Sequence, residues 1–563
     1  MKTNQKNVNK EKTTAIILFL IACCLYGMYY DFCGAVLTAI LGIFAIIRTF
    51  HKKKIQIQLS YGFVMAGIFV LGYGLSVFWA VDSGMAVGGI FRVLWIVLFL
   101  LLFGMEDHTD SKHILDAIPY IGIGMVLISV VGYKISAIGE HVIVNNRIGG
   151  LFQYPNTFAI FLLLGMIVLM TKEKIGRKEM ILCVFLAMGI GLTGSRIGMV
   201  LFIVTVVIIS IIYKRPLFLA MIALVVVAAV IFICVLGNYD TIGRLFQISI
   251  SESTLVGRLL YAKDALPLLL THPFGMGHMG YYYASTAVQT GMYSVQYVHN
   301  DLLQIGLDIG WIPMLAYLGA VIGTFRAKTV ERSHKIMLGV IFVHGLLDFD
   351  LSFTVILFIA FWIMNEAKFQ SKKDYFLSNK VLAALAIIFM CAGINIAISQ
   401  IAEYNGNMEL ALQFYPWNTQ AELKLISDTE DAEQLEQYCD DVLERNETCS
   451  LAYYGKAMTS YIEDDYEKMI TYQKKAIEKD YFNKEQYRNY GNMLLEGILS
   501  DTVTETVREK CIQEYLKIPD MLSEAKEKLS SLGKKIKDQP DLELDQEMIE
   551  VIQILNDSVN ENQ

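Results

Sequence analysis

Thirteen stretches of this 563-residue chain are apolar over lengths close to those that cross a lipid bilayer as a helix. Such a helix needs about 20 mostly apolar residues, with some latitude for tilt. The stretches are 13–31, 33–50, 60–80, 84–103, 114–135, 151–170, 179–194, 196–213, 216–237, 299–323, 336–348, 351–366 and 380–400. Because 336–348 is short, we predict an all-α polytopic membrane protein with about 12–13 transmembrane helices.

The composition excludes a purely soluble enzyme and divides the chain into two parts. Hydrophobic residues make up 55% and charged residues 18%, against roughly 45–50% and about 25% in soluble domains. Residues 1–400 carry 30 Lys and Arg against 20 Asp and Glu, whereas residues 401–563 carry 17 against 35. We therefore expect a membrane domain over 13–400, a soluble helical domain over 401–535 and a frayed, polar acidic tail over 536–563.

The basic residues also predict the orientation of the chain. With residues 1–12 in the cytoplasm, 23 Lys and Arg fall in cytoplasmic segments. Six fall in outer loops, and these are Lys134, Arg147, Arg196, Arg244, Arg258 and Lys263. Short cytoplasmic loops of membrane proteins are enriched in Lys and Arg. An odd number of spans then places the large loop at about 238–298 and the acidic C-terminal part outside the cytoplasm.

Arg147, Arg196 and Arg258 stand at the outer ends of apolar runs or in the large outer loop. The planar guanidinium group binds two phosphate oxygens at once and stays charged at any working pH. Three such groups together would suit a diphosphate, whereas any one alone could simply anchor a lipid headgroup. Arg92, inside the run 84–103, is either a fourth diphosphate ligand or the partner of a buried carboxylate.

The run 299–323 opens with His299, Asn300 and Asp301, and Asp308 follows seven residues later. Asp301 and Asp308 share one helical face, and carboxylates at membrane depth are functional candidates that need a cationic partner. The alternative for Asp308 is a structural ion pair with Arg92. His299 and Asn300 could equally be no more than a helix cap.

Other chemistries lack their motifs. There is no H-E-x-x-H sequence, no EF-hand-like loop, no phosphate-binding glycine loop and no C-x-x-C pair among the nine cysteines. Asp348 and Asp350 flank a helix corner, where they could be structural or chelating. We therefore expect no metal, no cofactor and no nucleic-acid partner.

Five stretches in this order resemble the O-antigen ligase and Wzy-type polymerase superfamily of polytopic glycosyltransferases. They are 146–152 with 154–156, 192–196, Arg258 with 272–277, 298–304 leading to Gly310, and 344–350. The resemblance covers about residues 60–366. It implies a GT-C-like membrane fold in the bacterial cytoplasmic membrane, and a glycan donor linked to undecaprenyl diphosphate.

The resemblance also implies roles for the candidate residues. Arg147, Arg196 and Arg258 would bind the donor diphosphate, and His299 would orient or deprotonate the acceptor hydroxyl. We also count Arg92 among the candidate diphosphate ligands. Transfer would occur on the outer face, with inversion and without a metal. The supporting residues would be Asn156, Asn300, Asp301, Asp308, His344 and Asp348. The acceptor would be an envelope lipid, a cell-wall polymer, a protein or a growing polysaccharide.

The soluble part reads as helical pairs. Small and aromatic residues recur over 450–483 at tetratricopeptide-like spacing, about 34 residues per unit. A repeat array of this kind offers a concave surface for a protein partner. The alternative is a generic bundle of amphipathic helices.

Several functions remain open at this point. Ligase and polymerase share one donor chemistry and differ only in the acceptor. A peptidoglycan polymerase is the closest enzymatic rival, although its signature sequences are not visible. A flippase or exporter of lipid-linked glycans would spread charges along its spans, and a membrane scaffold would tolerate replacement of every candidate residue.

Overall fold

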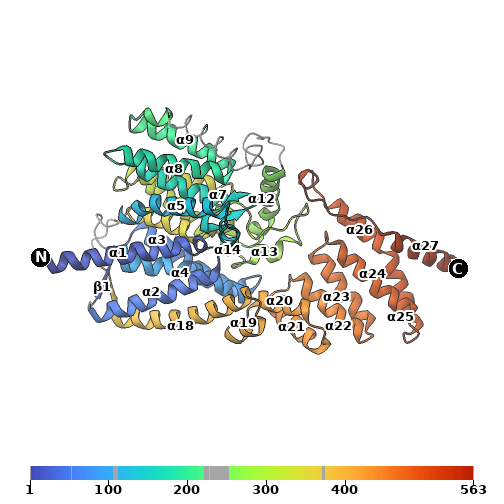
Figure 1. Cartoon of the computed structure of the whole chain (residues 1–563). Coiled ribbons are helices and arrows are strands. Elements are labelled where there is room, and N and C mark those ends of the chain that lie inside the picture. The colour runs from blue at the N-terminus through green and yellow to red at the C-terminus, as the bar shows by residue number, and fades with distance from the viewer. Residues whose placement is uncertain are drawn as a thin grey trace.

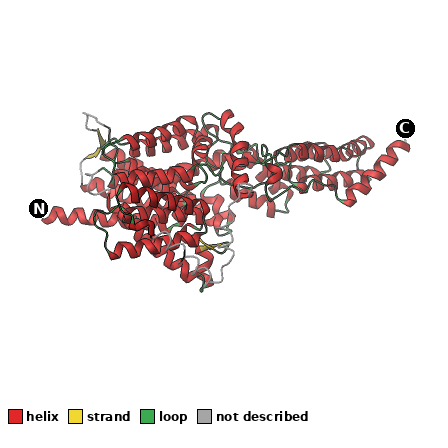
Figure 2. Ribbon diagram, turned by 90° about the horizontal axis from the view of Figure 1, so that it is seen from above, coloured by secondary structure: helices red, strands yellow, loops and turns green. Residues whose placement is uncertain are grey.

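The computed structural model describes residues 2–51, 54–105, 112–220, 227, 253–369 and 375–561, and these are mostly helical (Figures 1 and 2). The longer helices of the membrane body are α1 (Lys2–Cys24), α2 (Asp31–His51), α3 (Tyr61–Ser76), α4 (Ser83–Phe103), α5 (Lys112–Gly132), α7 (Pro155–Met170), α8 (Arg177–Thr193), α9 (Arg196–Ile212), α12 (Ser253–Thr271), α15 (Trp311–Arg326), α16 (Arg332–Gly345), α17 (Thr354–Met364) and α18 (Asn379–Tyr404).

Shorter elements join these helices. They are η1 (Tyr26–Met28), η2 (Val77–Trp79), α6 (Ser136–Val142), η3 (Gly150–Phe152), α13 (Gly280–Ser285), α14 (Asp301–Ile309) and η4 (Asp350–Ser352), with strands β1 (Lys54–Ile57), β2 (Ile143–Val144), β3 (Arg147–Ile148) and β4 (Tyr375–Ser378). β1 pairs antiparallel with β4, and β2 pairs antiparallel with β3.

Five of the described helices are long and apolar enough to cross a membrane. They are Asp31–Phe50, Tyr61–Trp79, Ser83–Phe103, His113–Gly132 and Asn379–Tyr404. Pro155–Met170, Arg196–Ile212, Trp311–Arg326 and Thr354–Met364 are shorter apolar helices. The prediction of a helical, multi-pass membrane protein is thus confirmed. The predicted run 216–237 lies largely outside the described residues, as does Arg244.

The core of the body lies around α4, α7 and α17. Every residue of α17 is buried, and α7 is buried at all but one position. A helix that is apolar on all sides belongs in the interior, so these three form the centre and α2 packs with α18 at one side of the body.

The predicted single run 299–323 forms two helices, α14 and α15, that meet at Gly310. Gly310 has φ of +92°, a conformation that glycine adopts without steric cost. The loop 272–277 packs against this break. The backbone N–H of Met276 donates to the carbonyl of Leu307 (2.6 Å), and that of Trp311 donates to Pro273 (2.9 Å). The loop therefore satisfies backbone groups that a broken helix leaves unpaired.

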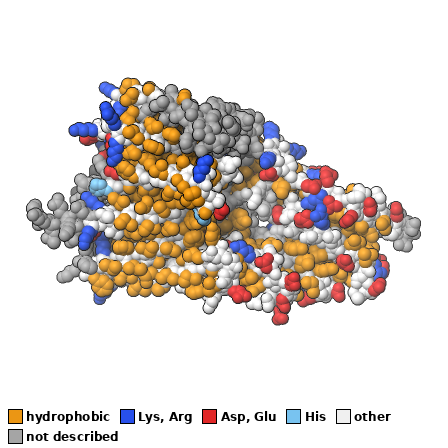
Figure 3. All heavy atoms as spheres, in the orientation of Figure 1, with side chains coloured by type: hydrophobic (Ala, Val, Ile, Leu, Met, Phe, Trp, Pro, Cys, Tyr) orange, Lys and Arg blue, Asp and Glu red, His pale blue; other side chains and the backbone are white. Residues whose placement is uncertain are grey.

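The two ends of the body differ in charge (Figure 3). Lys and Arg gather at the end where the N-terminus lies, and hydrophobic side chains cover the sides. Contacts tie the basic segments together at this end. Arg215 donates to the carbonyl of Lys172 (2.7 Å), and Thr329 donates to that of Glu366 (2.9 Å). The C-terminal domain projects from the opposite end (Figure 1).

The C-terminal domain is a succession of helices, most of which pack on the next in the chain. They are α19 (Met408–Phe414), α20 (Thr419–Asp428), α21 (Ala432–Arg445), α22 (Ser450–Ile462), α23 (Tyr466–Lys479), α24 (Lys484–Leu499), α25 (Glu505–Leu516), α26 (Ile518–Glu527), η5 (Gly533–Lys535) and α27 (Gln546–Glu561). The starts of α22 and α24 have the spacing of about 34 residues expected of repeat units. Within the predicted tail, α27 buries Met548 and Leu555 in the domain core.

This domain is held to the body by direct contacts. Nδ2 of Asn446 donates to Oδ2 of Asp82 at 3.2 Å, and Tyr415 donates to the carbonyl of Gly84 at 2.7 Å. The backbone N–H of Ser530 donates to the carbonyl of Thr290 in the large loop at 2.9 Å. The domain therefore packs against both the helix ends and the loop at one end of the body.

Candidate active site

A fully buried carboxylate, Asp348, links several candidate residues at the end of the membrane body that contacts the C-terminal domain. Its Oδ1 accepts a hydrogen bond from the hydroxyl of Tyr154 (2.8 Å), and its Oδ2 accepts one from Nδ2 of Asn156 (2.9 Å). Oδ2 also pairs with Nη2 of Arg258 at 2.8 Å. A buried charge needs such donors in place of water. Asp348 therefore orients both Asn156 and Arg258.

Asn156 extends this link to a second arginine. Its Oδ1 accepts from Nη2 of Arg147 at 2.9 Å, while Nε of Arg147 donates to the carbonyl of Thr193 at 2.6 Å. Thr193 ends α8, and Arg196 opens α9 three residues later. The structure thus joins Arg147 and Arg258 in one hydrogen-bonded network with Asn156 and Asp348. It also places Arg196 close in sequence to Thr193, whose carbonyl binds Arg147.

His299 lies beside this hydrogen-bonded network, in the loop before α14. Its ring is 4.8 Å from that of Phe349 and 5.5 Å from that of Tyr261, centroid to centroid. Nδ1 lies 3.0 Å from the carbonyl of Tyr297. A carbonyl only accepts, so Nδ1 carries the proton and Nε2 of the neutral ring keeps its lone pair. Among the described residues, none forms a hydrogen bond with Nε2.

The backbone of His299 is held in an unusual conformation, with φ of +55°. A non-glycine residue in the left-handed region costs roughly 1–3 kcal/mol and persists only where its surroundings impose it. Asn300 supplies one constraint. Its Oδ1 caps α14 by accepting from the N–H of Leu303 (2.9 Å), and its Nδ2 donates to the carbonyl of Leu346 (2.8 Å). Asn300 therefore caps α14 and also links the start of this helix to the segment that contains Leu346 and Asp348.

A second set of buried polar groups lies next to the hydrogen-bonded network around Asp348. Nδ1 of His344 pairs with Oδ2 of Asp350, whose Oδ1 accepts from the hydroxyl of Thr157 at 2.6 Å. Oδ1 of Asp301 accepts from the backbone N–H of Leu351 at 3.0 Å. These groups are fully or nearly fully buried, so they support the segment that carries Asp348 and do not face solvent.

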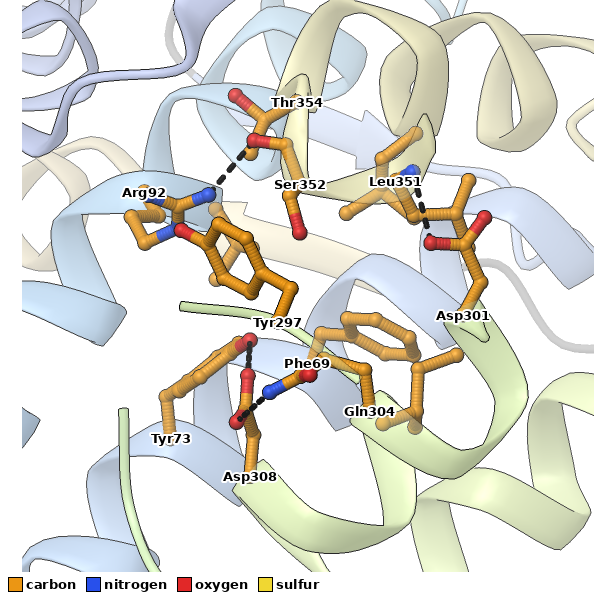
Figure 4. Close-up of a pocket in the computed structure, with 13 residues that line it drawn as sticks. Phe69, Tyr73, Arg92, Tyr297, Asp301, Gln304, Asp308, Leu351, Ser352 and Thr354 are labelled. Atoms are coloured by element: carbon orange, nitrogen blue, oxygen red, sulfur yellow. Dashed lines mark hydrogen bonds between the residues drawn. The ribbon is translucent and has the colours of Figure 1, made fainter. Parts of the chain in front are cut away.

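Arg92 and Asp308 lie in a separate cavity of about 30 Å³ (Figure 4). The guanidinium of Arg92 binds Oδ1 of Asp31 (2.5 Å), the carbonyl of Ser352 (2.6 Å) and the carbonyl of Tyr29 (2.9 Å). Arg92 is thus not brought together with the arginines near Asp348. Its partners are those of a structural ion pair in the body.

The alternative ion pair between Asp308 and Arg92 is not formed. Asp308 instead accepts hydrogen bonds from the hydroxyl of Tyr73 (2.9 Å) and Nε2 of Gln304 (2.7 Å), as Figure 4 shows. Sequence reasoning missed the true partner of Arg92, which is Asp31. The available signal was an acidic residue at the end of the first apolar run, since a buried arginine needs a counter-charge.

We expect the replacement Asp31→Ala to destabilise the protein by about 3–5 kcal/mol, because it leaves a buried arginine without its partner. Asp31 also accepts from Nε2 of His278 at 2.8 Å, so a second buried group loses its acceptor. Thermal unfolding of the full chain in detergent measures the effect. Glu409→Ala, at an exposed position, is the control, and equal melting temperatures for the two variants would contradict this role.

Tyr154 is the other residue that sequence reasoning did not single out. Beyond its bond to Asp348, its ring stacks on that of Phe353 at 5.6 Å and packs on Phe349 at 4.7 Å. Tyr154 lies within the stretch 154–156 that carries the family resemblance, but only Asn156 was predicted to have a role. Among the described residues, no three His, Cys, Asp or Glu side chains form a group that could hold a metal ion.

Comparison with known proteins adds one family. Residues 181–318, from within α8 to within α15, match the sequence profile of the O-antigen ligase family. This segment contains Arg196, Arg258 and His299. No curated protein matches the chain. The match implies glycan transfer of the ligase or polymerase type on lipid-linked substrates. It does not include the C-terminal domain, whose tetratricopeptide assignment stays a prediction.

Proposed function

We propose that this chain transfers a glycan from undecaprenyl diphosphate to a hydroxyl group of an envelope acceptor, on the outer face of the bacterial cytoplasmic membrane. One observation carries the proposal. His299, whose Nε2 has no hydrogen-bond partner among the described residues, lies beside two arginines that a buried carboxylate links. This group lies at the end of the body that faces away from the basic segments, and basic segments favour the cytoplasm.

The arginines are the proposed ligands of the diphosphate. Arg258 is 16% exposed and is held from behind by Asp348, so part of its guanidinium can meet a ligand. Arg196 and Arg147 would complete the site from the neighbouring helix and hairpin. Fixed cations aimed at the leaving group stabilise the negative charge that grows there in the transition state. They need no reorganisation when the bond breaks.

His299 is the proposed base. The acceptor oxygen forms a bond to the anomeric carbon while the bond from that carbon to the diphosphate oxygen breaks. The hydroxyl proton passes to Nε2 of His299. The electron pair of the broken bond stays on the diphosphate oxygen, and Arg196 and Arg258 bind the departing diphosphate. Attack opposite the leaving group inverts the configuration. The tyrosine carbonyl at Nδ1 holds the tautomer that this proton transfer requires.

The experiment uses the full chain in lipid nanodiscs with a defined undecaprenyl-diphosphate glycan and fractions of the host envelope. We expect glycan to appear on one acceptor fraction, with the opposite anomeric configuration to the donor. Growth of the lipid-linked glycan itself would indicate the polymerase form of the same chemistry. No transfer to any fraction would contradict the proposal and favour a scaffold or flippase.

The pH profile of transfer should report His299. Burial is the largest influence on the pKa of His299 and lowers it from the ordinary value, against the opposing effect of the Asp348 charge. The unprotonated ring is the active form, so kcat should be level above about pH 6.5 and fall as the pH drops through the lowered pKa. A profile measured by glycan transfer that reaches half its maximum only above about pH 7 would contradict this.

A further inference from the structure

A second cleft, of about 360 Å³, opens where the C-terminal domain meets the membrane body. Its volume falls in the range of roughly 300–1,000 Å³ typical of small-molecule sites. The body supplies the η1–α2 turn, the loop around α13 and the end of α18, and the C-terminal domain supplies α20. Neither part forms this cleft without the other.

Several aromatic rings line the cleft. Tyr30 packs edge-on against Tyr404 with ring centroids 5.7 Å apart, and stacks on Phe32 at 5.5 Å. Tyr404 is 57% exposed at the last turn of α18, although it sits against these rings. Tyr282 contributes a further ring from α13. Rigid, amphipathic rings of this kind offer an apolar face with a polar edge.

Side-chain amides also line the cleft. Gln296, Gln400 and Gln420 all border the cleft. Oε1 of Gln400 is buried and has no hydrogen-bond partner among the described residues. An amide both donates and accepts, so Oε1 of Gln400 can accept from a hydroxyl group of a ligand, whereas the amides of Gln296 and Gln420 already bond to tyrosine hydroxyls of the protein. Glu403 and Lys424 add an ion pair (3.7 Å) at the rim.

The cleft also adjoins the candidate active site. Oε1 of Gln296 accepts from the hydroxyl of Tyr29 at 2.8 Å, and Gln296 stands three residues before His299. The ring of Tyr297 lies 5.3 Å from that of Phe349, which in turn contacts His299. A ligand in the cleft would therefore lie within one short loop of the proposed base.

We propose that this cleft is a saccharide-binding subsite built jointly by the membrane body and the C-terminal domain. Sugar rings present apolar C–H faces, which suit Tyr30 and Tyr404, and hydroxyl groups, which suit the Gln400 oxygen that has no partner among the described residues. The subsite holds glycan units away from the reacting bond. The inference rests on the proposed function. It gives the C-terminal domain a role in glycan recognition, besides any protein partner.

The test measures binding and transfer separately, with the full chain in nanodiscs. The binding probe is host envelope polysaccharide, released by mild acid and fluorescently labelled. Tyr404→Ala and Gln400→Ala should each weaken its binding by about tenfold, which corresponds to about 1.4 kcal/mol. Tyr375→Ala, a tyrosine with 43% exposure in β4, is the matched control and should bind as the parent does.

Transfer kinetics identify which glycan the subsite holds. Tyr404→Ala should raise KM for either the acceptor or the donor and leave kcat within about twofold, since remote contacts add uniform binding. A raised acceptor KM assigns the cleft to the acceptor, and a raised donor KM assigns it to the donor glycan. Unchanged binding and unchanged KM in both cleft variants would overturn the subsite, even where transfer proceeds. Absence of transfer in the parent would instead contradict the proposed function, and the binding arm would still decide the subsite.

Discussion

Replacing His299 with alanine should lower kcat for glycan transfer by about 10²–10⁴-fold, the usual contribution of a general base. Nε2 of His299 has no partner among the described residues, and its Nδ1 lies 3.0 Å from a carbonyl that only accepts. The side chain is therefore prepared to take a proton. Transfer from the lipid-linked donor, followed under saturating donor and acceptor, is the measurement.

His141→Ala serves as the matched control, because His141 is exposed at the end of α6 and is not one of the residues that bond to Asp348. It should retain the parental rate. Donor binding should also survive in His299→Ala, since this ring is not a proposed ligand of the diphosphate. A His299→Ala variant with more than half of the parental kcat would show that the base lies elsewhere.

Replacing Arg258 with alanine should lower kcat by about 10²–10³-fold, the loss seen when one preorganised group at a developing charge is removed. Arg258 is the more exposed partner of the ion pair with Asp348, at 16% against 0%. Lys263→Ala is the control, because Lys263 is an exposed cation on the same helix, α12. It should leave the rate unchanged.

Asp348 acts through Arg258 in this account, as a positioning residue. Asp348→Asn keeps the shape of the side chain and removes the charge that orients the guanidinium. The double variant with Arg258→Ala and Asp348→Asn should therefore lose little more kcat than Arg258→Ala alone. The effects of residues that act as one unit are not additive. Full additivity of the two losses would mean that Asp348 acts independently of Arg258.

The membrane body followed from the sequence because a bilayer imposes one simple length on every span. The break of 299–323 at Gly310 did not, since it depends on the loop 272–277 packing against the helix ends. The packing of α27 was missed for a related reason. Its composition is polar, and only the folded domain shows that Met548 and Leu555 face the core.

The candidate site was predicted in part. Local stretches pointed to Arg147, Arg258 and His299, because their residue types suit a diphosphate and a proton. Their linkage through Asp348 was beyond reach, since Asp348 is 192 residues from Asn156 and 90 from Arg258. Arg92 was grouped with the diphosphate ligands for its charge alone. Its placement with Asp31 depends on how α2 and α4 pack.

The central claim is that one site couples cleavage of a lipid diphosphate to glycan transfer. The most direct measurement counts undecaprenyl diphosphate released and glycan transferred in the same reaction, with purified full chain in nanodiscs. We predict one lipid diphosphate for each glycan on the acceptor, with both products lost together in His299→Ala. Release without transfer, or transfer that persists unchanged in His299→Ala, would contradict it.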